Sequence, residues 1–186
     1  LFGAVSRMTH QKGLDVLAEI ADTLLATPAQ LVVLGSGETA LQQRYQALAQ
    51  KHPGKMAVQI GFDEGLSHQI EAGADIFVMP SRFEPCGLNQ MYSQRYGTPP
   101  VVHATGGLLD SVVDCTPETL KKRSATGFVF SPLDADSLLA ACRRAADTWR
   151  DKRVWKQLQK NGMACDFSWD LRAQQYVELY RALLAG

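Results

Sequence analysis

The chain has 186 residues, of which 46% are hydrophobic and 20% are charged, a composition that is ordinary for a globular protein. Its 19 basic and 19 acidic residues give a formal net charge of +0, which argues against a nucleic-acid binder held by a general basic field. No apolar run approaches the ~18 residues of a membrane span, and no segment resembles a signal peptide. We therefore expect neither a nucleic acid nor a membrane as a partner.

The four cysteines are widely spaced and form neither a CxxC pair nor a Cys/His metal pattern. A domain of this length buries about 70% of its unfolded surface, so it needs no disulfide framework. We therefore expect reduced cysteines, no metal site and a cytoplasmic location. Because the chain opens directly on an apolar stretch without a methionine, we also expect it to be a piece of a longer polypeptide.

Short apolar runs alternate with amphipathic stretches almost throughout the chain. The apolar runs predict strands at LFGAVS (1–6), LVVLG (31–35), MAVQIG (56–61), DIFVMP (75–80), PPVVHA (99–104) and GFVFS (127–131). Helical spacing predicts helices near 13–26, 38–51, 65–73 and 87–96, from about 107, and near 135–149, 151–163 and 170–184. This order predicts one α/β lobe with a Rossmann-like, doubly wound parallel sheet over about 1–131 and a helical tail over 132–186.

Sheets of this kind bind ligands beyond the carboxyl ends of their strands, so the strand-to-helix turns are the candidate sites. The first turn, SRMTHQKG, carries Arg7 and Lys12 just before a helix begins, an arrangement that suits a phosphate or diphosphate. The alternative is that both are solvated surface cations. The third turn places Phe62 directly after a strand, where an aromatic ring either packs in the core or stacks on a planar base.

The second turn, GSGETA, satisfies a loose G-x-G-x-x-A dinucleotide pattern with Gly35, Gly37 and Ala40. The turn does not belong to the first strand–helix unit, and no acidic residue follows about 20 residues later at a strand end. The pattern therefore favours glycines that permit a tight turn and close packing over a dinucleotide site.

The fourth turn, SRFEPCGLNQ, brings together a carboxylate, a proline, a thiol and a glycine. Pro85 stiffens the turn, Gly87 permits close backbone approach, and the amides of Cys86, Gly87 and Leu88 could donate to sugar hydroxyls. Glu84 could bind hydroxyls or face a developing cation. Alternatively, Glu84 is a helix N-terminal charge and Cys86 a small buried hydrophobe; a cysteine nucleophile has little support, because no histidine evidently pairs with it.

The fifth turn, HATGGLLDSV, provides a second candidate anion site at the same edge of the sheet. Thr105 can cap a helix, and Gly106 and Gly107 leave its first amides unobstructed. Two anion-suited turns and a carboxylate–glycine turn on one edge predict a binding site there.

Taken together, these stretches resemble the bacterial and plant glycogen/starch synthases, retaining glycosyltransferases with the two-lobed GT-B fold. The matching pieces are VSRMTHQKGLD, SHQIEAGADIFVMPSRFEPCGLNQMYSQRYGTPPVV, TGGLLDSVVD, GFVF and DFSW, in order from residue 5 to 169. PSRFEPCGL and TGGL are the most specific of them. The resemblance implies that this chain is the carboxyl-terminal, donor-binding lobe, without the amino-terminal acceptor lobe.

The resemblance also implies an activity and roles for the site residues. The full enzyme would transfer glucose from ADP-glucose to the non-reducing end of an α-1,4-glucan with retention, without a cofactor or metal. Arg7 and Lys12 would hold the donor diphosphate together with the amides of residues 105–107. Glu84 and the amides of residues 86–88 would face the transferred glucose, and Phe62 would lie against the adenine. The final helices would cross back toward the other lobe.

The sequence departs from the family pattern at several positions. His103 and Ala104 replace a residue that is usually basic before TGGL, Gln69 stands where the family has arginine, and Asn89 where it has threonine. Related transferases carry a second glutamate at the position of Tyr92, so their ribose contacts are not carried over. A nicotinamide-dinucleotide domain, a retaining transferase that uses a UDP-sugar, and a non-catalytic glucan-binding module are the alternatives.

Overall fold

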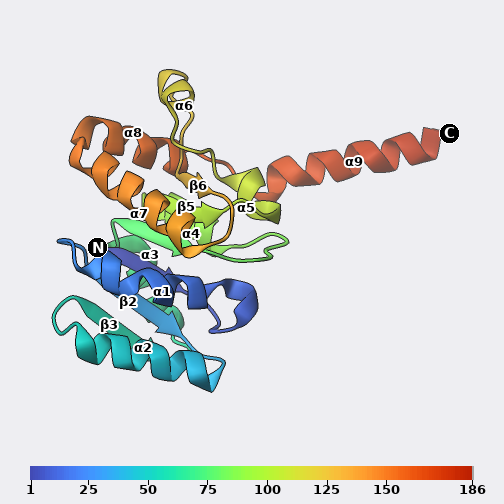
Figure 1. Ribbon diagram of the computed structural model, residues 1–186. Coiled ribbons are helices and arrows are strands. Elements are labelled where there is room, and N and C mark those ends of the chain that lie inside the picture. Colours follow the sequence, from blue (N-terminus) through green and yellow to red (C-terminus); the bar gives the residue numbers. More distant parts are fainter. Residues whose placement is uncertain (186) are drawn as a thin grey trace.

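The computed structural model describes residues 1–185, which fold around a parallel sheet with helices on both faces (Figure 1). Within these residues the sheet has six strands in the order β3-β2-β1-β4-β5-β6. The strands are β1 (Phe2–Val5), β2 (Leu31–Gly35), β3 (Met56–Ile60), β4 (Ile76–Met79), β5 (Pro100–His103) and β6 (Phe128–Phe130). The predicted Rossmann-like parallel sheet is confirmed, with each predicted apolar run forming one strand.

The helices follow the predicted alternation with three differences. They are α1 (Leu14–Leu25), α2 (Thr39–Lys51), α3 (Glu64–Gly73), α4 (Asn89–Tyr96), α5 (Gly106–Ser111), α6 (Pro117–Lys121), α7 (Ala135–Arg150), α8 (Lys152–Met163) and α9 (Trp169–Ala185). The short 3-10 turn η1 (His10–Lys12) and helix α6 were not predicted. Helix α4 begins two residues later than expected, because Gly87 has a φ of 71°, in the left-handed region that a right-handed helix cannot include.

Alternating side chains of the strands build the core on one face of the sheet. Phe2 and Ala4 of β1 and Leu31 and Val33 of β2 lie in one buried cluster with the apolar faces of α1 and α7. On the other face, α3 covers β1 and β2, while α4 covers β4 and β5. The strands are therefore buried on both faces, which explains their near-continuous apolar sequences.

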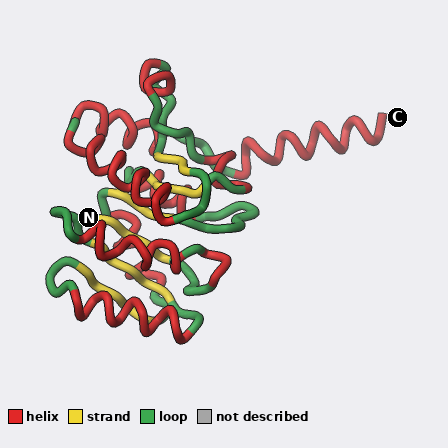
Figure 2. The backbone as a smooth tube through the Cα atoms, in the orientation of Figure 1, coloured by secondary structure: helices red, strands yellow, loops and turns green. Residues whose placement is uncertain are grey.

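The strand order reverses between β1 and β4, the neighbours at the centre of the sheet. Phe2 of β1 pairs with Leu31 of β2 on one side and with Ile76 of β4 on the other. The loops that follow β1 and β4 leave the same edge of the sheet side by side (Figure 2). Ligands of doubly wound sheets bind in the crevice at this switch point.

Helices α7, α8 and α9 relate to the sheet in different ways. Buried residues of α7 and α8, such as Leu138 and Trp155, belong to the same core cluster as β1 and β2. Helix α9 instead extends away from the body of the lobe (Figure 1). It leaves large apolar side chains exposed, among them Trp169, Tyr180 and Leu184. The proposed division into a core of about 1–131 and a tail of 132–186 stays a prediction, although α7 and α8 pack as part of the core.

Candidate functional site

An arginine–aspartate pair ties together the two loops at the switch point. The Arg82 guanidinium donates from Nη1 and Nη2 to the two carboxylate oxygens of Asp15 over 2.6 and 2.7 Å, and also from Nη1 to the carbonyl of His10. Burial alone would raise the pKa of Asp15, but the hydrogen bond and charge of Arg82 outweigh burial and hold that pKa below its usual range. Such a two-point contact fixes the loop after β4 against the start of α1.

Directly beside this pair, Lys12 forms an ion pair with Glu84. Lys12 Nζ lies 2.5 Å from Glu84 Oε2, and the two side chains are only 17% and 8% exposed. The hydroxyl of Ser81 donates to the same carboxylate oxygen over 3.2 Å, and His103 Nδ1 donates to the Ser81 carbonyl over 2.8 Å. The first and fourth turns of the chain thus place a cation and a carboxylate in direct contact.

The position of Glu84 excludes one of its two interpretations. Helix α4 begins only at Asn89, so Glu84 lies outside its first turn and does not complement the helix dipole. Its partners are Lys12 and Ser81 instead. The interpretation as a helix N-terminal charge is therefore wrong. The role of Glu84 as a site residue stays a prediction.

A cavity of about 210 Å³ lies at the carboxyl ends of β1, β2 and β3. Arg7 and Phe62 both line it, and Phe62 is 89% exposed, so this ring is not part of the core. The Arg7 side chain is exposed and has no hydrogen-bond or ion-pair partner among residues 1–185. Asn89, another lining residue, donates from Nδ2 to the Val5 carbonyl over 3.2 Å. An unpaired cation and an open aromatic face thus share one cavity.

The loop of residues 85–88 presents backbone donors beside Glu84. The amides of Cys86, Gly87 and Leu88 have no acceptor within the described part of the chain. Cys86 is exposed, so it is not the small buried hydrophobe of the alternative interpretation. The φ of 71° at Gly87 is the reason why this position requires glycine. Three amides on a loop that leads into α4 can therefore donate to hydroxyl or anionic groups.

The TGG turn packs more tightly against this loop than the sequence suggests. The amide of Thr105 donates to the His103 carbonyl over 2.8 Å, and that of Gly107 donates to the Glu84 carbonyl over 3.0 Å. A Cβ atom at Gly106 would lie 2.2 Å from the Glu84 carbonyl oxygen. Of the three amides expected to face a phosphate, only that of Gly106 has no acceptor within residues 1–185. The glycines serve the close approach of the two loops.

The glycines of the GSGETA turn also have a packing role. A Cβ atom at Gly35 would lie 1.9 Å from the carbonyl oxygen of Ser6, and one at Gly37 would lie 2.3 Å from that of Met8. The amide of Glu38 donates to the same Met8 carbonyl over 2.8 Å. These contacts support the interpretation of the G-x-G-x-x-A pattern as a tight turn, and they place the turn against the Arg7 loop.

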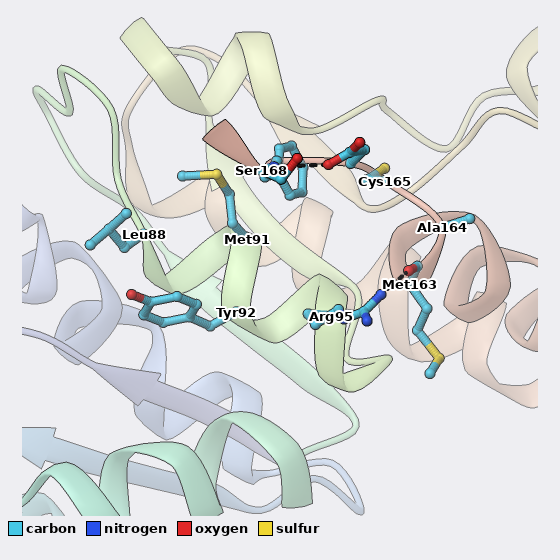
Figure 3. Close-up of a pocket in the computed structure, with 10 residues that line it drawn as sticks. Leu88, Met91, Tyr92, Arg95, Met163, Ala164, Cys165 and Ser168 are labelled. Carbon is cyan, nitrogen blue, oxygen red and sulfur yellow. Dashed lines mark hydrogen bonds between the residues drawn. The ribbon is translucent and has the colours of Figure 1, made fainter. Parts of the chain in front are cut away.

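A larger cavity, of about 540 Å³, lies between α4 and the segment that follows α8 (Figure 3). The sequence did not predict this cavity. Its walls come from Leu88, Met91, Tyr92, Arg95, Met163, Ala164, Cys165, Asp166, Phe167 and Ser168. Arg95 donates to the carbonyl of Met163 over 3.0 Å, so it spans the cavity wall. The larger cavity is lined by neither Arg7 nor Phe62, and we therefore place the candidate site at the carboxyl edge of the sheet. The larger cavity cannot be predicted from local sequence, because segments distant in the chain form it.

Among residues 1–185, no group of three or more His, Cys, Asp or Glu side chains could hold a metal ion. None of the helices in the same range is both long and apolar enough to cross a membrane.

Known proteins resemble this chain over its whole length. The glycogen synthase of Nitrosospira multiformis is 62% identical over 184 residues, which are 99% of this chain and 37% of that relative. The glycogen synthase of Dechloromonas aromatica is 56% identical over 185 residues, 100% of this chain and 38% of that relative. The chain thus spans little more than a third of the length of these relatives.

Solved structures show the same fold. The catalytic domain of Starch Synthase IV from Arabidopsis thaliana, bound to ADP and acarbose, matches 100% of this chain and 38% of its own length, with a TM-score of 0.88 and 34% identity. Sucrose-phosphate synthase from Thermosynechococcus elongatus matches 99% of this chain and 45% of its own, with a TM-score of 0.72 and 26% identity. The family model described as "Glycosyl transferases group 1" matches residues 1–162. The chain therefore belongs to the group 1 glycosyl transferases.

Proposed function

We propose that this chain is the donor-binding lobe of a glycogen synthase. The full enzyme transfers glucose from ADP-glucose to the non-reducing end of an α-1,4-glucan with retention of configuration. The observation that carries the proposal is that Arg7 and Phe62 line one cavity at the carboxyl edge of the sheet, where Lys12 also pairs with Glu84. The glycogen synthases at 62% and 56% identity and the starch synthase that was solved with ADP support the same assignment.

In this proposal the nucleoside diphosphate occupies the cavity at the ends of β1, β2 and β3. The exposed ring of Phe62 stacks on the adenine, because a base offers a flat apolar face to an aromatic side chain. Arg7 and Lys12 bind the diphosphate, Arg7 by its planar fork and Lys12 as a compact charge. The amide of Gly106 is the donor that the TGG turn adds.

The glucose of the donor lies against Glu84 and the loop of residues 85–88. The amides of Cys86, Gly87 and Leu88 donate to its hydroxyl oxygens, and Glu84 accepts from a hydroxyl. During transfer the bond between the anomeric carbon and the diphosphate oxygen breaks, and the 4-hydroxyl oxygen of the glucan terminus bonds to that carbon. The diphosphate leaves with the bonding electron pair, and one of its oxygens takes up the proton of that hydroxyl.

Electrostatics of fixed groups lower the barrier of this step. The transferred glucose passes through an oxocarbenium-like state, and Glu84 stabilises its positive charge. Negative charge grows at the same time on the leaving diphosphate, next to Arg7 and Lys12. Preorganised donors of this kind each contribute about 3–4 kcal/mol of transition-state stabilisation. The contact between Lys12 and Glu84 holds both groups in position before the donor binds.

The glucan acceptor is bound mainly by the part of the enzyme outside this chain, and α9 crosses toward that part. The large exposed apolar side chains of α9 support this role, because exposed apolar surface of this kind marks contacts with other protein surface. The switch-point site would then lie between the two lobes. We place the enzyme in the cytoplasm, in line with its reduced cysteines.

Calorimetry of the chain with ADP, UDP, ADP-glucose and NADH tests the proposed donor. We expect heat of binding with ADP and ADP-glucose, and weaker or no binding of UDP and NADH. Preferred binding of UDP would instead point to a retaining transferase that uses a UDP-sugar. Tight NADH binding without competition by ADP would instead reject the transferase proposal, and binding of an oligosaccharide alone would point to a glucan-binding module.

A further inference from the structure

We propose that Gln90 is a positioning residue that sets the conformation of the sugar-facing loop, residues 85–88. This inference rests on the proposed function, because it assigns the loop amides to the donor glucose. Gln90 is the second residue of α4 and is fully buried, with 0% of its surface exposed. It does not touch the donor itself but acts through the backbone of the loop.

The side-chain amide of Gln90 clamps two consecutive peptide groups of this loop. Its Nε2 atom donates to the carbonyl oxygens of Cys86 and Gly87, each over 3.0 Å. Both peptide bonds are trans, and in a trans peptide the N–H group points opposite to the C=O group. The amides of Gly87 and Leu88 belong to these same two peptide groups. Gln90 therefore turns both N–H groups away from the buried side of the loop and toward the site.

The same side chain couples the sugar-facing loop to the TGG turn. Gln90 Nε2 also lies 3.0 Å from the hydroxyl oxygen of Ser111, which donates in turn to the Gly107 carbonyl over 2.6 Å. The Gly107 amide donates to the carbonyl of Glu84. One buried amide thus connects the loop that faces the sugar with the turn that faces the phosphate.

The other polar atom of the Gln90 side-chain amide lies against the loop glycine. Gln90 Oε1 is buried and has no hydrogen-bond partner within the described residues. A Cβ atom at Gly87 would lie 2.4 Å from this oxygen, so Gln90 and the loop glycine are fitted to each other. Steric fit and two hydrogen bonds therefore both hold Gln90 against the loop.

Gln94, one turn later on α4, provides a matched control. It is 1% exposed, and its Nε2 atom donates to the carbonyls of Gln90 and Ser111 over 3.1 and 3.0 Å. It makes no hydrogen bond to the loop of residues 85–88. Replacing either glutamine removes a buried amide that is bonded to α5, but only one of the two replacements releases the loop.

The experiment compares Gln90→Leu, Gln90→Glu and Gln94→Leu in the full-length enzyme. The measurements are the melting temperature, the ADP affinity, kcat with ADP-glucose and the alkylation rate of the exposed Cys86 thiol. We expect both Gln90 variants to lose about 10- to 100-fold in kcat, the scale of a small misplacement of reacting groups. Their ADP affinity should stay within about threefold, because Gln90 bonds to none of Arg7, Lys12 and Phe62. Gln94→Leu should keep kcat within about threefold at a similar loss of melting temperature.

Gln90→Glu keeps the shape of the side chain but brings a carboxylate against the two carbonyls, so it tests the clamp if Gln90→Leu fails to fold. Equal kcat losses in the Gln90 and Gln94 variants, or full kcat in Gln90→Glu, would overturn the inference. Cys86 alkylation reads the loop conformation independently of catalysis and should change only in the Gln90 variants. A wild-type enzyme without glucosyl transfer would reject the proposed function, while the Cys86 rates would still decide the role of Gln90.

Discussion

Lys12 and Glu84 are 72 positions apart in the chain, yet the Nζ atom of one lies 2.5 Å from the Oε2 atom of the other. Their contact joins the turn after β1 to the turn after β4 across the switch point of the sheet. Both side chains are largely withdrawn from solvent, at 17% and 8% exposure. The pair is therefore part of the folded framework as well as part of the proposed site, and this double role shapes the predictions for both residues.

Glu84→Gln should lower both the activity and the stability of the full enzyme. The change removes the charge that faces the sugar, and we expect kcat to fall about 10²- to 10³-fold, the effect of losing one preorganised electrostatic group. Lys12 also loses a charged partner, so the free energy of unfolding should fall by about 1–3 kcal/mol. ADP affinity should change little. Activity assays, denaturant unfolding and calorimetry on the same preparation measure the three quantities.

The stability measurement also tests the contact itself. An unchanged unfolding free energy would mean that Lys12 and Glu84 are not paired in solution. Full activity together with reduced stability would leave Glu84 as a structural residue and remove it from the proposed mechanism. Glu38→Gln, on another carboxylate of the same sheet edge that accepts from the His10 amide, is a suitable control.

Arg7→Ala and Lys12→Ala should reduce activity alike but stability differently. Each removes a cation from the diphosphate and should cost about 2–4 kcal/mol in kcat/KM. Arg7 is exposed and unpaired within the described chain, so its loss should leave the melting temperature unchanged. Loss of Lys12 leaves Glu84 buried without its cation and should lower the melting temperature. Unchanged kinetics for both variants would identify them as surface cations.

The isolated chain should bind ADP weakly and transfer essentially no glucose. The proposed site lies between two lobes, and the acceptor-binding groups are assigned to the other lobe. Incubation of the pure chain with ADP-glucose and a short α-1,4-glucan, followed by analysis of the glucan length, measures this. Clear elongation by the isolated chain would show that the acceptor-binding groups lie within these 186 residues.

Much of the fold and part of the site could be predicted from the sequence, because both depend on local patterns. Apolar runs and helical spacing identify the strands and the main helices, and the doubly wound order places the turns that contain Arg7, Phe62 and Glu84 on one edge. The resemblance to glycogen and starch synthases rests on the same short stretches.

What the sequence could not predict are contacts that depend on tertiary packing. Nothing in the local pattern pairs Lys12 with Glu84, or commits the Gly107 amide to the Glu84 carbonyl. The clamp by Gln90 is also invisible, because a glutamine in the first turn of an amphipathic helix usually faces solvent. The cavity between α4 and the segment after α8 forms only when distant residues meet. Arg95 and Met163, for example, are 68 positions apart in the chain.

Glu71→Gln should stabilise the protein at neutral pH and lose this effect in acid. Glu71 is 1% exposed, and burial raises the pKa of its carboxyl above the usual 4.5, although the hydrogen bond from His68 partly opposes the shift. A carboxyl group whose pKa is raised by folding is harder to ionise in the folded protein than in the unfolded chain. At a pH above the pKa of Glu71 in the folded protein, its charged form therefore destabilises the fold. As pH falls through that value toward 4.5, protonation relieves the penalty. Melting curves of both proteins between neutral pH and pH 4 measure the converging difference, and a gap that widened in acid would contradict the assignment.

Phe62→Ala should weaken nucleotide binding without affecting the fold. The ring is 89% exposed, so its removal takes almost no apolar surface out of the core, and the melting temperature of the free protein should stay unchanged. If the ring stacks on adenine, the free energy of ADP binding should become less favourable by about 1–3 kcal/mol, the usual contribution of one base–aromatic stack.

Phe62→Tyr keeps the flat ring and should retain the affinity, which separates stacking from a general effect of changing the loop. Inorganic diphosphate has no base, so its affinity should be equal in all three proteins. An ADP affinity that is unchanged in Phe62→Ala would place the base elsewhere in the cavity, whereas a parallel loss for ADP and diphosphate would show that the change disturbs the Arg7 loop instead.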